Sequence, residues 1–232
     1  MFEMGTGECA VATGTLGSGK RDDEARAIAK AMQNGPHTTT LRTLPATASS
    51  PAQTCFFDLL RAPDFHIVLF GAGHVGRALV KVIAELACTV TWVDSRDDAF
   101  PNEVPANVKL ICTDAPETEV DAARGGSYFL VMTHSHALDQ TLCAQILRRT
   151  DFAYLGLIGS TSKRRQFERR LLGRGISSAQ LARMNCPIGA AGIAGKEPAT
   201  IAIAVAAEIL QRRSQHQCAA RNPDAATPVL AS

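Results

Sequence analysis

The chain has 232 residues, a length that suits one domain of about 150 residues with a smaller unit beside it. Its 24 basic and 22 acidic residues are spread along the chain and leave a net charge of +2, which argues against a protein built to bind nucleic acid or an anionic membrane. The seven cysteines are scattered, form no C-x-x-C pair and are typical of reduced thiols. No signal sequence or membrane-spanning segment is recognisable, so we expect a cytoplasmic protein.

The sequence pattern of residues 1–62 predicts a small, incomplete N-terminal unit followed by a linker. A strand at 9–12, a tight loop at 14–20 and a helix at 22–32 precede a stretch rich in Thr, Ser, Pro and Ala, with at most one strand near 39–44. The loop satisfies G-x-x-x-x-G-K, a pattern of NTPases, but Arg21 stands where Ser or Thr would hold Mg²⁺. A glycine turn into a helix is therefore favoured over an NTPase site.

Residues 63–213 alternate between strand and helix patterns. Strands are predicted at 66–70, 89–94, 108–111, 128–133 and 152–158, and helices at 75–86, 137–149, 163–172 and 198–213. This alternation indicates right-handed βαβ units, and hence an α/β fold with a Rossmann-like, doubly wound parallel sheet. Residues 214–232 lack periodicity and are expected to form a disordered tail.

A glycine motif follows the first of these strands. Gly71, Gly73 and Gly76 fill G-x-G-x-x-G: the first permits a tight turn, the second lets backbone approach a phosphate, and the third lets helix and strand pack closely. Asp94 ends the next strand, 18 positions after Gly76, where an acid that binds ribose and disfavours a 2′-phosphate belongs. We interpret the loop as a phosphate cradle at a helix N-terminus, against the alternative of a plain turn.

The segment from Thr133 to Asp139 follows the predicted central strand and carries H-x-H-x-x-D. His134, His136 and Asp139 are residue types that bind Zn²⁺ or Fe²⁺, but their spacing matches no strong metal pattern. A polar loop that contacts a ligand is favoured, and a simple helix cap by Ser135 is the other alternative. We therefore predict no metal site.

Two further loops are candidates for ligand contact. The first, from Gly156 to Arg164, offers glycines, hydroxyls and cations that suit an anion, although a capped helix with a solvated basic face explains it equally well. The second, from Cys186 to Glu197, has too many glycines for a regular element and is expected to line the site. Cys186 is a candidate thiolate near Lys196, against the commoner case of an inert buried cysteine.

Ligands of such sheets bind beyond the carboxyl ends of the strands, near the point where the strand order reverses. No catalytic residue is predicted, because no acid or base suited to hydride chemistry accompanies the motif and no substrate domain follows the sheet. The predicted cofactor-binding residues are Gly71, Ala72, Gly73, His74, Val75, Gly76, Asp94, Ser95, Arg96, Thr133, His134, His136, Asp139, Gly159, Ser160, Lys163, Cys186, Gly189, Lys196 and Glu197.

Several blocks of this chain occur in the same order in one known family. They are LFGAGHVGRALV (69–80), VTWVDSRDDAFP (90–101), VMTHSHALD (131–139), YLGLIGSTSKRRQF (154–167), CPIG (186–189) and GIAGKEPATIAIAVAAEIL (192–210). On these blocks the chain closely resembles the Rossmann domain of the XdhC/CoxI family, the xanthine dehydrogenase accessory proteins. The segment GTLGSGK (14–20) is similar to a GTIGGG-like segment of the family's N-terminal domain, whereas Gln53 to Phe57 is a poor trace of its QCCGG-like segment, with Cys55 alone retained.

The resemblance implies a chaperone and not an enzyme. Family members are understood to bind molybdenum cofactor, a molybdopterin that carries a phosphate, to guard it during sulfuration and to deliver it to xanthine dehydrogenase, an enzyme of purine catabolism. The implied partners are xanthine dehydrogenase and a cysteine desulfurase, and a homodimer is compatible with the family. An NAD-dependent oxidoreductase, or a sensor that binds NAD(P), remains the alternative, because fold alone does not separate these functions.

Overall fold

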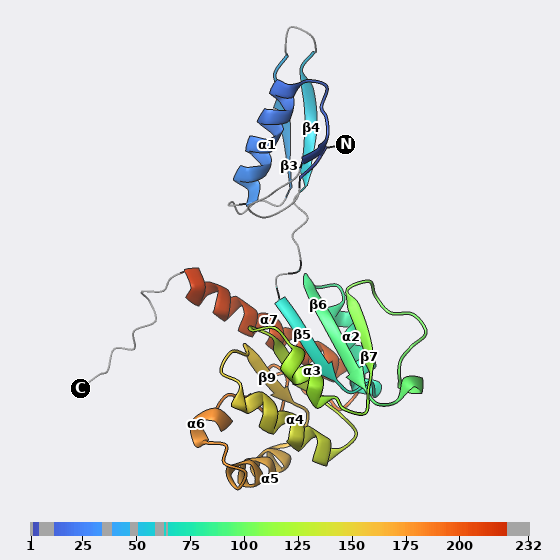
Figure 1. The fold of residues 1–232 in the computed structure, drawn as a ribbon, viewed down its shortest axis with the longest axis vertical. Coiled ribbons are helices and arrows are strands. Elements are labelled where there is room, and N and C mark those ends of the chain that lie inside the picture. The colour runs from blue at the N-terminus through green and yellow to red at the C-terminus, as the bar shows by residue number, and fades with distance from the viewer. Residues whose placement is uncertain are drawn as a thin grey trace, which may run out of the picture. The chain divides into compact units, whose positions relative to one another are not determined.

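The structure, a computed structural model, describes residues 2–4, 12–33, 39–46, 51–58, 63 and 65–221. The chain divides into two compact units, Met1–Ala62 and Pro63–Ser232 (Figure 1). Within the described ranges, no helix combines the length and the apolar character needed to cross a membrane.

The N-terminal unit contains two antiparallel strand pairs and a helix. β1 (Phe2–Met4) pairs with β2 (Ala12–Gly14), α1 spans Gly19–Gln33, and β3 (Thr39–Leu44) pairs with β4 (Gln53–Asp58). The helix expected at 22–32 is confirmed and begins earlier, because Ser18 Oγ accepts from the Arg21 amide at 3.4 Å and caps it. Of the strand expected at 9–12, residues 9–11 lie outside the described ranges. β4 was not expected, since its apolar run is only three residues long.

The C-terminal unit is built on a parallel sheet with the strand order β10-β9-β8-β5-β6-β7. Every neighbouring pair in it is parallel. The Rossmann-like fold class is therefore confirmed, and the order reverses between β5 and β8. The strands are β5 (Phe65–Phe70), β6 (Cys88–Asp94), β7 (Val108–Cys112), β8 (Tyr128–Val131), β9 (Tyr154–Leu157) and β10 (Met184–Asn185).

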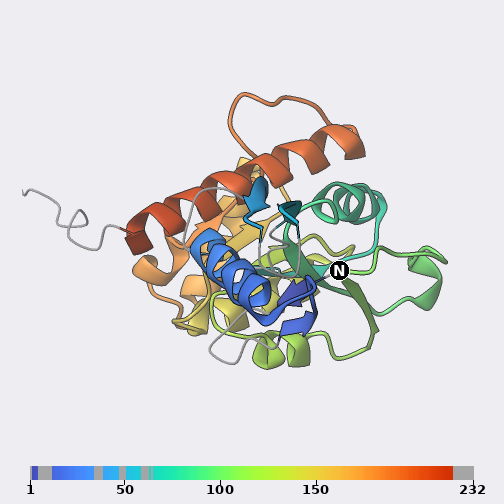
Figure 2. The ribbon, with the colours of Figure 1, turned by 90° about the horizontal axis from the view of Figure 1, so that it is seen from above.

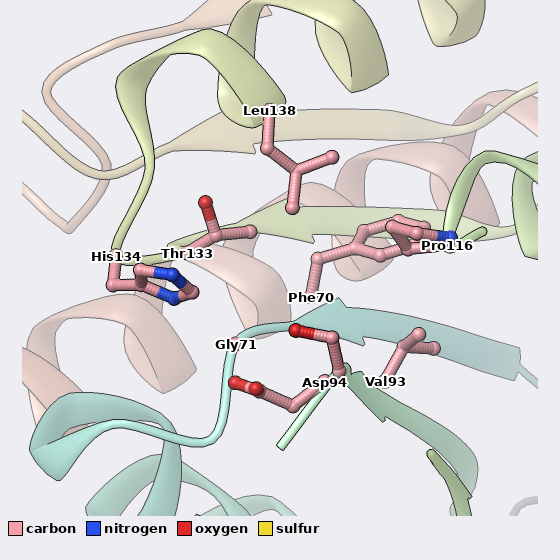
Figure 3. A pocket seen from close by; sticks show the side chains of 9 residues that line it. Phe70, Gly71, Val93, Asp94, Pro116, Thr133, His134 and Leu138 are labelled. Atoms are coloured by element: carbon pink, nitrogen blue, oxygen red, sulfur yellow. The ribbon is translucent and has the colours of Figure 1, made fainter. Parts of the chain in front are cut away.

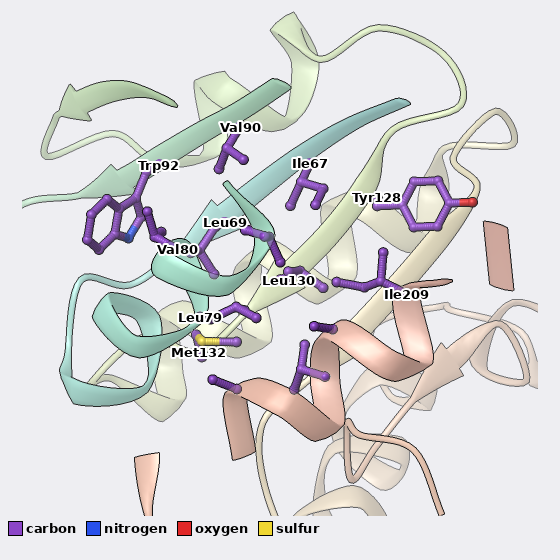
Figure 4. Packing of buried hydrophobic residues seen from close by; sticks show 14 of the residues in the cluster. Ile67, Leu69, Leu79, Val80, Val90, Trp92, Tyr128, Leu130, Met132 and Ile209 are labelled. Carbon is purple, nitrogen blue, oxygen red and sulfur yellow. The ribbon is translucent and has the colours of Figure 1, made fainter. Parts of the chain in front are cut away.

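Helices cover both faces of this sheet, because successive strand residues point to opposite faces and both sets are apolar. Ile67 and Leu69 face α2 (His74–Ile83) and α7 (Pro198–Arg221), which lie side by side on one layer (Figures 2 and 4). Val68 and Phe70 face the other layer, which contains α4 (His136–Arg148) and α5 (Thr161–Leu172). The shorter helices are η1 (Asp97–Ala99), α3 (Glu117–Ala122) and α6 (Ser178–Leu181).

The tail is the main correction to the predicted organisation. α7 continues to Arg221, so the expectation of disorder from residue 214 is wrong for residues 214–221; residues 222–232 lie outside the described ranges. The last turns are polar and carry no apolar periodicity, but Gln and Ala are good helix formers. His216 Nδ1 also lies 2.9 Å from the Tyr128 hydroxyl, which ties this part of the helix to β8.

Candidate functional site

A narrow cleft lies at the carboxyl edge of the sheet, where the strand order reverses. Its volume is about 10 Å³, room for a single water-sized group. The lining residues come from the ends of β5 and β6, from the segments that follow β5, β6, β7 and β8, and from the first turn of α4, as Figure 3 shows. They are Phe70, Gly71, Val93, Asp94, Ser95, Pro116, Thr133, His134 and Leu138.

The three glycines of the G-x-G-x-x-G loop have different roles. Gly71 has φ +114°, and a Cβ there would lie 2.3 Å from the Met132 carbonyl oxygen. A Cβ on Gly76 would lie 2.2 Å from the Gly71 carbonyl oxygen, so both positions need glycine to let the chain pack. At Gly73 a Cβ would meet no heavy atom within 4 Å. Gly73 is thus the glycine whose exposed backbone is open to a ligand.

The N-terminus of α2 adds to this open side. Gly73 is the N-cap residue and provides no side-chain hydrogen bond to the first turn. The amides that follow it are therefore without a side-chain cap, and the helix dipole makes this end attractive to an anion. His74, the first residue of α2, is exposed beside it. The loop therefore has the features that its sequence predicts for a phosphate cradle.

Asp94 is buried and fully hydrogen-bonded. Its Oδ2 accepts from the Ala72 amide at 2.7 Å and from Arg96 Nη2 at 3.0 Å, and its Oδ1 accepts from Arg96 Nε at 2.9 Å and from the Arg96 amide at 3.0 Å. Burial acts to raise the pKa of Asp94, but the hydrogen bonds from Arg96 and Ala72 outweigh it and lower the pKa to about 2. The carboxylate is therefore ionised, and it holds the glycine loop against β6.

Trp92, in β6, also holds the glycine loop in place. Its indole Nε1 donates to the Gly71 carbonyl oxygen at 3.0 Å, and the side chain is buried. Sequence reasoning did not identify this residue, nor Phe70, Val93, Pro116 and Leu138 in the cleft. Phe70 and Val93 are the apolar residues directly before Gly71 and Asp94, so the strand-end rule applied one residue earlier would have found them.

Asp139 and Lys163 join the two other predicted loops. Asp139 is completely buried; its Oδ1 accepts from the Thr133 amide at 3.1 Å and hydroxyl at 2.7 Å, and its Oδ2 lies 2.7 Å from Lys163 Nζ. Lys163 Nζ also donates to the Ile158 carbonyl oxygen at 2.8 Å. Both charged groups are therefore used inside the protein, and they fix the loop after β8 to the start of α5.

The remaining residues of these loops divide between the cleft and the surface. Thr133 and His134 line the cleft, whereas His136 is exposed at the start of α4. Ser135 caps α4, because its Oγ accepts from the Leu138 amide at 3.3 Å. Within the described ranges, no three His, Cys, Asp or Glu side chains are grouped as a metal site.

Ser160 and Gly159 likewise serve the start of α5. Ser160 Oγ accepts from the Lys163 amide at 3.2 Å and caps the helix. A Cβ on Gly159 would lie 2.5 Å from Lys163 Cδ, so this glycine makes room for the lysine side chain, which is only 10% exposed. The capped-helix interpretation of this loop thus describes its observed contacts.

The Cys186–Glu197 segment does not contribute to the lining of the cleft. Cys186 is buried, its Sγ lies 4.0 Å from the Ser160 carbonyl oxygen, and burial raises the pKa of its thiol. The Gly189 amide donates to buried Glu208 Oε2 at 2.6 Å, which anchors the segment to α7. Lys196 and Glu197 are exposed. The thiol is therefore protonated and held inside the protein.

Comparison with known proteins agrees with this architecture. The family model described as the XdhC Rossmann domain matches residues 67–209. The chain belongs to the XdhC family. The predicted resemblance is thereby confirmed, and the match includes every residue that lines the cleft.

Two proteins are similar to this chain. The chain is 33% identical over 151 residues to the uncharacterized protein YqeB of Escherichia coli (strain K12), a match that covers 62% of this chain and 27% of that protein. The chain thus spans about a quarter of the length of this curated relative. It is also similar to the crystal structure of a xanthine dehydrogenase from Bacillus halodurans, with 18% identity and a TM-score of 0.58 over 87% of this chain and 67% of the other. That likeness shows a shared fold.

Proposed function

We propose that this protein carries molybdenum cofactor in the cytoplasm and supports its insertion into xanthine dehydrogenase. The observation that carries the proposal is the open glycine loop of an XdhC-family Rossmann unit, with Gly73 accessible and the first turn of α2 uncapped. The phosphate of the pterin is a group that such a loop binds. The cargo is a substrate that must be taken up and released, and no catalytic residue is needed.

The residues present fit the phosphate end of the cofactor better than its metal end. Gly73 and the amides of the first turn of α2 would hold the phosphate, with Ser95, Thr133 and His134 beside it. A soft thiolate ligand for molybdenum does not fit at Cys186, because this thiol is buried and its pKa is raised. We therefore assign to this unit the recognition of the pterin phosphate and not the coordination of molybdenum.

Release limits how tightly the cofactor can be held. A Kd of about 1 μM corresponds to about 8 kcal/mol of binding free energy, and tighter binding would slow delivery by lowering the dissociation rate constant. The exposed arginines of α5, Arg165, Arg169 and Arg170, suit an acidic surface on xanthine dehydrogenase. A cysteine desulfurase is the second partner that this role requires, since the cofactor is sulfurated before insertion.

The test has two parts. Protein purified anaerobically from a molybdopterin-producing host is expected to carry the pterin, identified by its absorbance and by molybdenum analysis. A strain without this gene is expected to assemble xanthine dehydrogenase that lacks active cofactor. Normal enzyme activity and molybdenum content in that strain, together with purified protein free of pterin, would contradict the proposal.

A further inference from the structure

We infer that Arg96 determines the ligand specificity of the glycine-loop site: by occupying Asp94 it favours a ligand that ends in a phosphate and disfavours a ribose dinucleotide such as NAD. This inference rests on the proposed function only in taking the glycine loop as the place where ligand binds. It assigns to Arg96 a role in specificity that the loop motif alone does not give.

The first step is the saturation of Asp94. An ionised carboxylate has about four acceptor positions, two on each oxygen. Here the Ala72 amide and Arg96 Nη2 use Oδ2, at 2.7 and 3.0 Å, while the Arg96 amide and Nε use Oδ1, at 3.0 and 2.9 Å. Three of the four donors belong to Arg96. A ribose hydroxyl has no free acceptor on Asp94 unless Arg96 leaves.

The second step is the strength of this arrangement. The two side-chain bonds are parallel and bidentate, the geometry that makes arginine–carboxylate pairs strong. With Arg96 in place the Asp94 side chain is only 3% exposed, so water has little access to the hydrogen bonds of the pair. Arg96 is 43% exposed and is thus reachable from solvent, while the acid behind it is not. A ribose would have to compete with an intramolecular partner that is always present.

The third step concerns phosphate. A free Asp94 carboxylate behind the Ala72 amide would repel an anion on the glycine loop, since the two would share one loop. The Arg96 guanidinium neutralises this charge and leaves Gly73 and the first turn of α2 accessible. The same residue therefore disfavours the ribose contact and permits the phosphate contact.

The experiment is a pair of calorimetric titrations on the full chain, one with NAD⁺ and one with inorganic phosphate. Arg96→Ala frees acceptor positions on Asp94 for the ribose hydroxyls of NAD⁺, and this gain should exceed the repulsion of the pyrophosphate, so the affinity for NAD⁺ should rise about tenfold over wild type. Inorganic phosphate has no ribose and meets only the repulsion, so the affinity for phosphate should fall. Arg77→Ala is the matched control. Arg77 is an exposed arginine of α2 that donates to the Ala99 and Asp98 carbonyl oxygens and not to Asp94, so both affinities should stay unchanged.

Arg96→Lys is a milder variant that controls for a folding defect, because lysine keeps the positive charge but cannot form the bidentate pair with Asp94. Its affinities for NAD⁺ and for phosphate should lie between those of wild type and of Arg96→Ala. Trp92, the single tryptophan, reports the integrity of the loop through its emission, since its indole contacts Gly71. Equal NAD⁺ affinity in wild type and in both folded Arg96 variants would overturn the inference. These titrations use no pterin, so they can fail or succeed independently of the cofactor-delivery role.

Discussion

The protein contains two glycine loops that lead into helices, and their contacts differ. In the loop at 14–20, Asp22 of the following helix accepts from the Leu16 amide at 2.7 Å and from the Thr15 hydroxyl at 2.9 Å. In the loop at 71–76, the acid comes from the next strand: Asp94 accepts from the Ala72 amide. The first loop is closed by its own helix, whereas the second is tied to a neighbouring strand of the sheet.

This difference separates a structural turn from the loop that we propose to bind the ligand. Asp22 takes the donors that a bound phosphate would need, and the hydrogen bond from the Leu16 amide lowers the pKa of Asp22, so the carboxylate remains charged. The negative charge of Asp22 would repel a phosphate in the 14–20 loop. Of the amides in the 71–76 loop, Asp94 accepts only from that of Ala72, and the first turn of α2 has no side-chain cap. The presence of three glycines therefore does not separate the two loops, but the position of the acid does.

Of the substitutions that test this comparison, Gly71→Ala in the second loop should reduce stability most. The new Cβ would meet the Met132 carbonyl oxygen at 2.3 Å, at a φ of +114° that side chains rarely adopt. Strain and overpacking together should lower the free energy of unfolding of the C-terminal unit by about 4 kcal/mol. Urea unfolding followed by the emission of Trp92 measures it, because this single tryptophan lies in that unit. A loss below about 1 kcal/mol would mean that the loop can rearrange freely.

Lys163→Met should have the next largest effect. It leaves the completely buried Asp139 carboxylate without its cation, a loss of about 3 kcal/mol. Arg165→Met, an exposed change on the same helix, is the control and should be nearly neutral. Adding Asp139→Asn to Lys163→Met should restore part of the stability, since no unpaired charge remains buried. Equal unfolding midpoints for Lys163→Met and Arg165→Met would show that the ion pair does not stabilise this edge.

Gly17→Ala tests the first loop with a smaller expected effect. Gly17 has φ +97°, but a Cβ there would meet no heavy atom, so only backbone strain of about 1–2 kcal/mol opposes the change. The Leu16 amide donates a hydrogen bond to Asp22, and its hydrogen exchange should become faster in Gly17→Ala. Gly19→Ala, with no positive φ and an equally open Cβ position, is the control and should leave this exchange rate unchanged. Identical exchange rates in both variants would argue against the strain at Gly17.

How far the sequence predicts these features depends on the range of the contacts. Local signals located the sheet and the glycine loop, because strand patterns and turns are written in neighbouring residues. The pairing of Asp139 with Lys163 joins residues 24 positions apart and has no local pattern. The saturation of Asp94 by Arg96 was not predicted either: the two residues are only two positions apart, but the direction of the Arg96 side chain has no local signal. The predicted ribose and cofactor contacts stay predictions.

Acid should destabilise the strand that leads into the second loop. His66 lies in β5 with Nδ1 3.0 Å from Ser127 Oγ and Nε2 2.9 Å from Thr91 Oγ1. Burial, and then the charge of Arg124, lower the pKa of His66 below its ordinary 6.5. Folding therefore favours neutral imidazole: stability is complete above pH 6.5 and decreases as the pH falls through and below that value. Unfolding midpoints measured from pH 7.5 downwards should decline less in His66→Gln, and parallel declines would contradict the assignment.

The smallest effect on stability, and the sharpest test of the comparison, is expected from Gly73→Val. The backbone at Gly73 has φ −72° and ψ −173°, an extended conformation that valine adopts readily, and a Cβ there meets nothing within 4 Å. The main cost is the replacement of an N-cap glycine by the less favourable valine, so the unfolding free energy should fall by no more than about 1 kcal/mol. Binding should fall, because a branched side chain would stand where a phosphate approaches the α2 amides. Calorimetry with inorganic phosphate measures the affinity, and the amount of pterin in the purified protein measures how much cofactor is carried. Gly19→Val, in the first loop, is the control and should change neither quantity from wild type. If the folded Gly73→Val protein bound them unchanged, the second loop would be a structural turn like the first, and the ligand site would lie elsewhere.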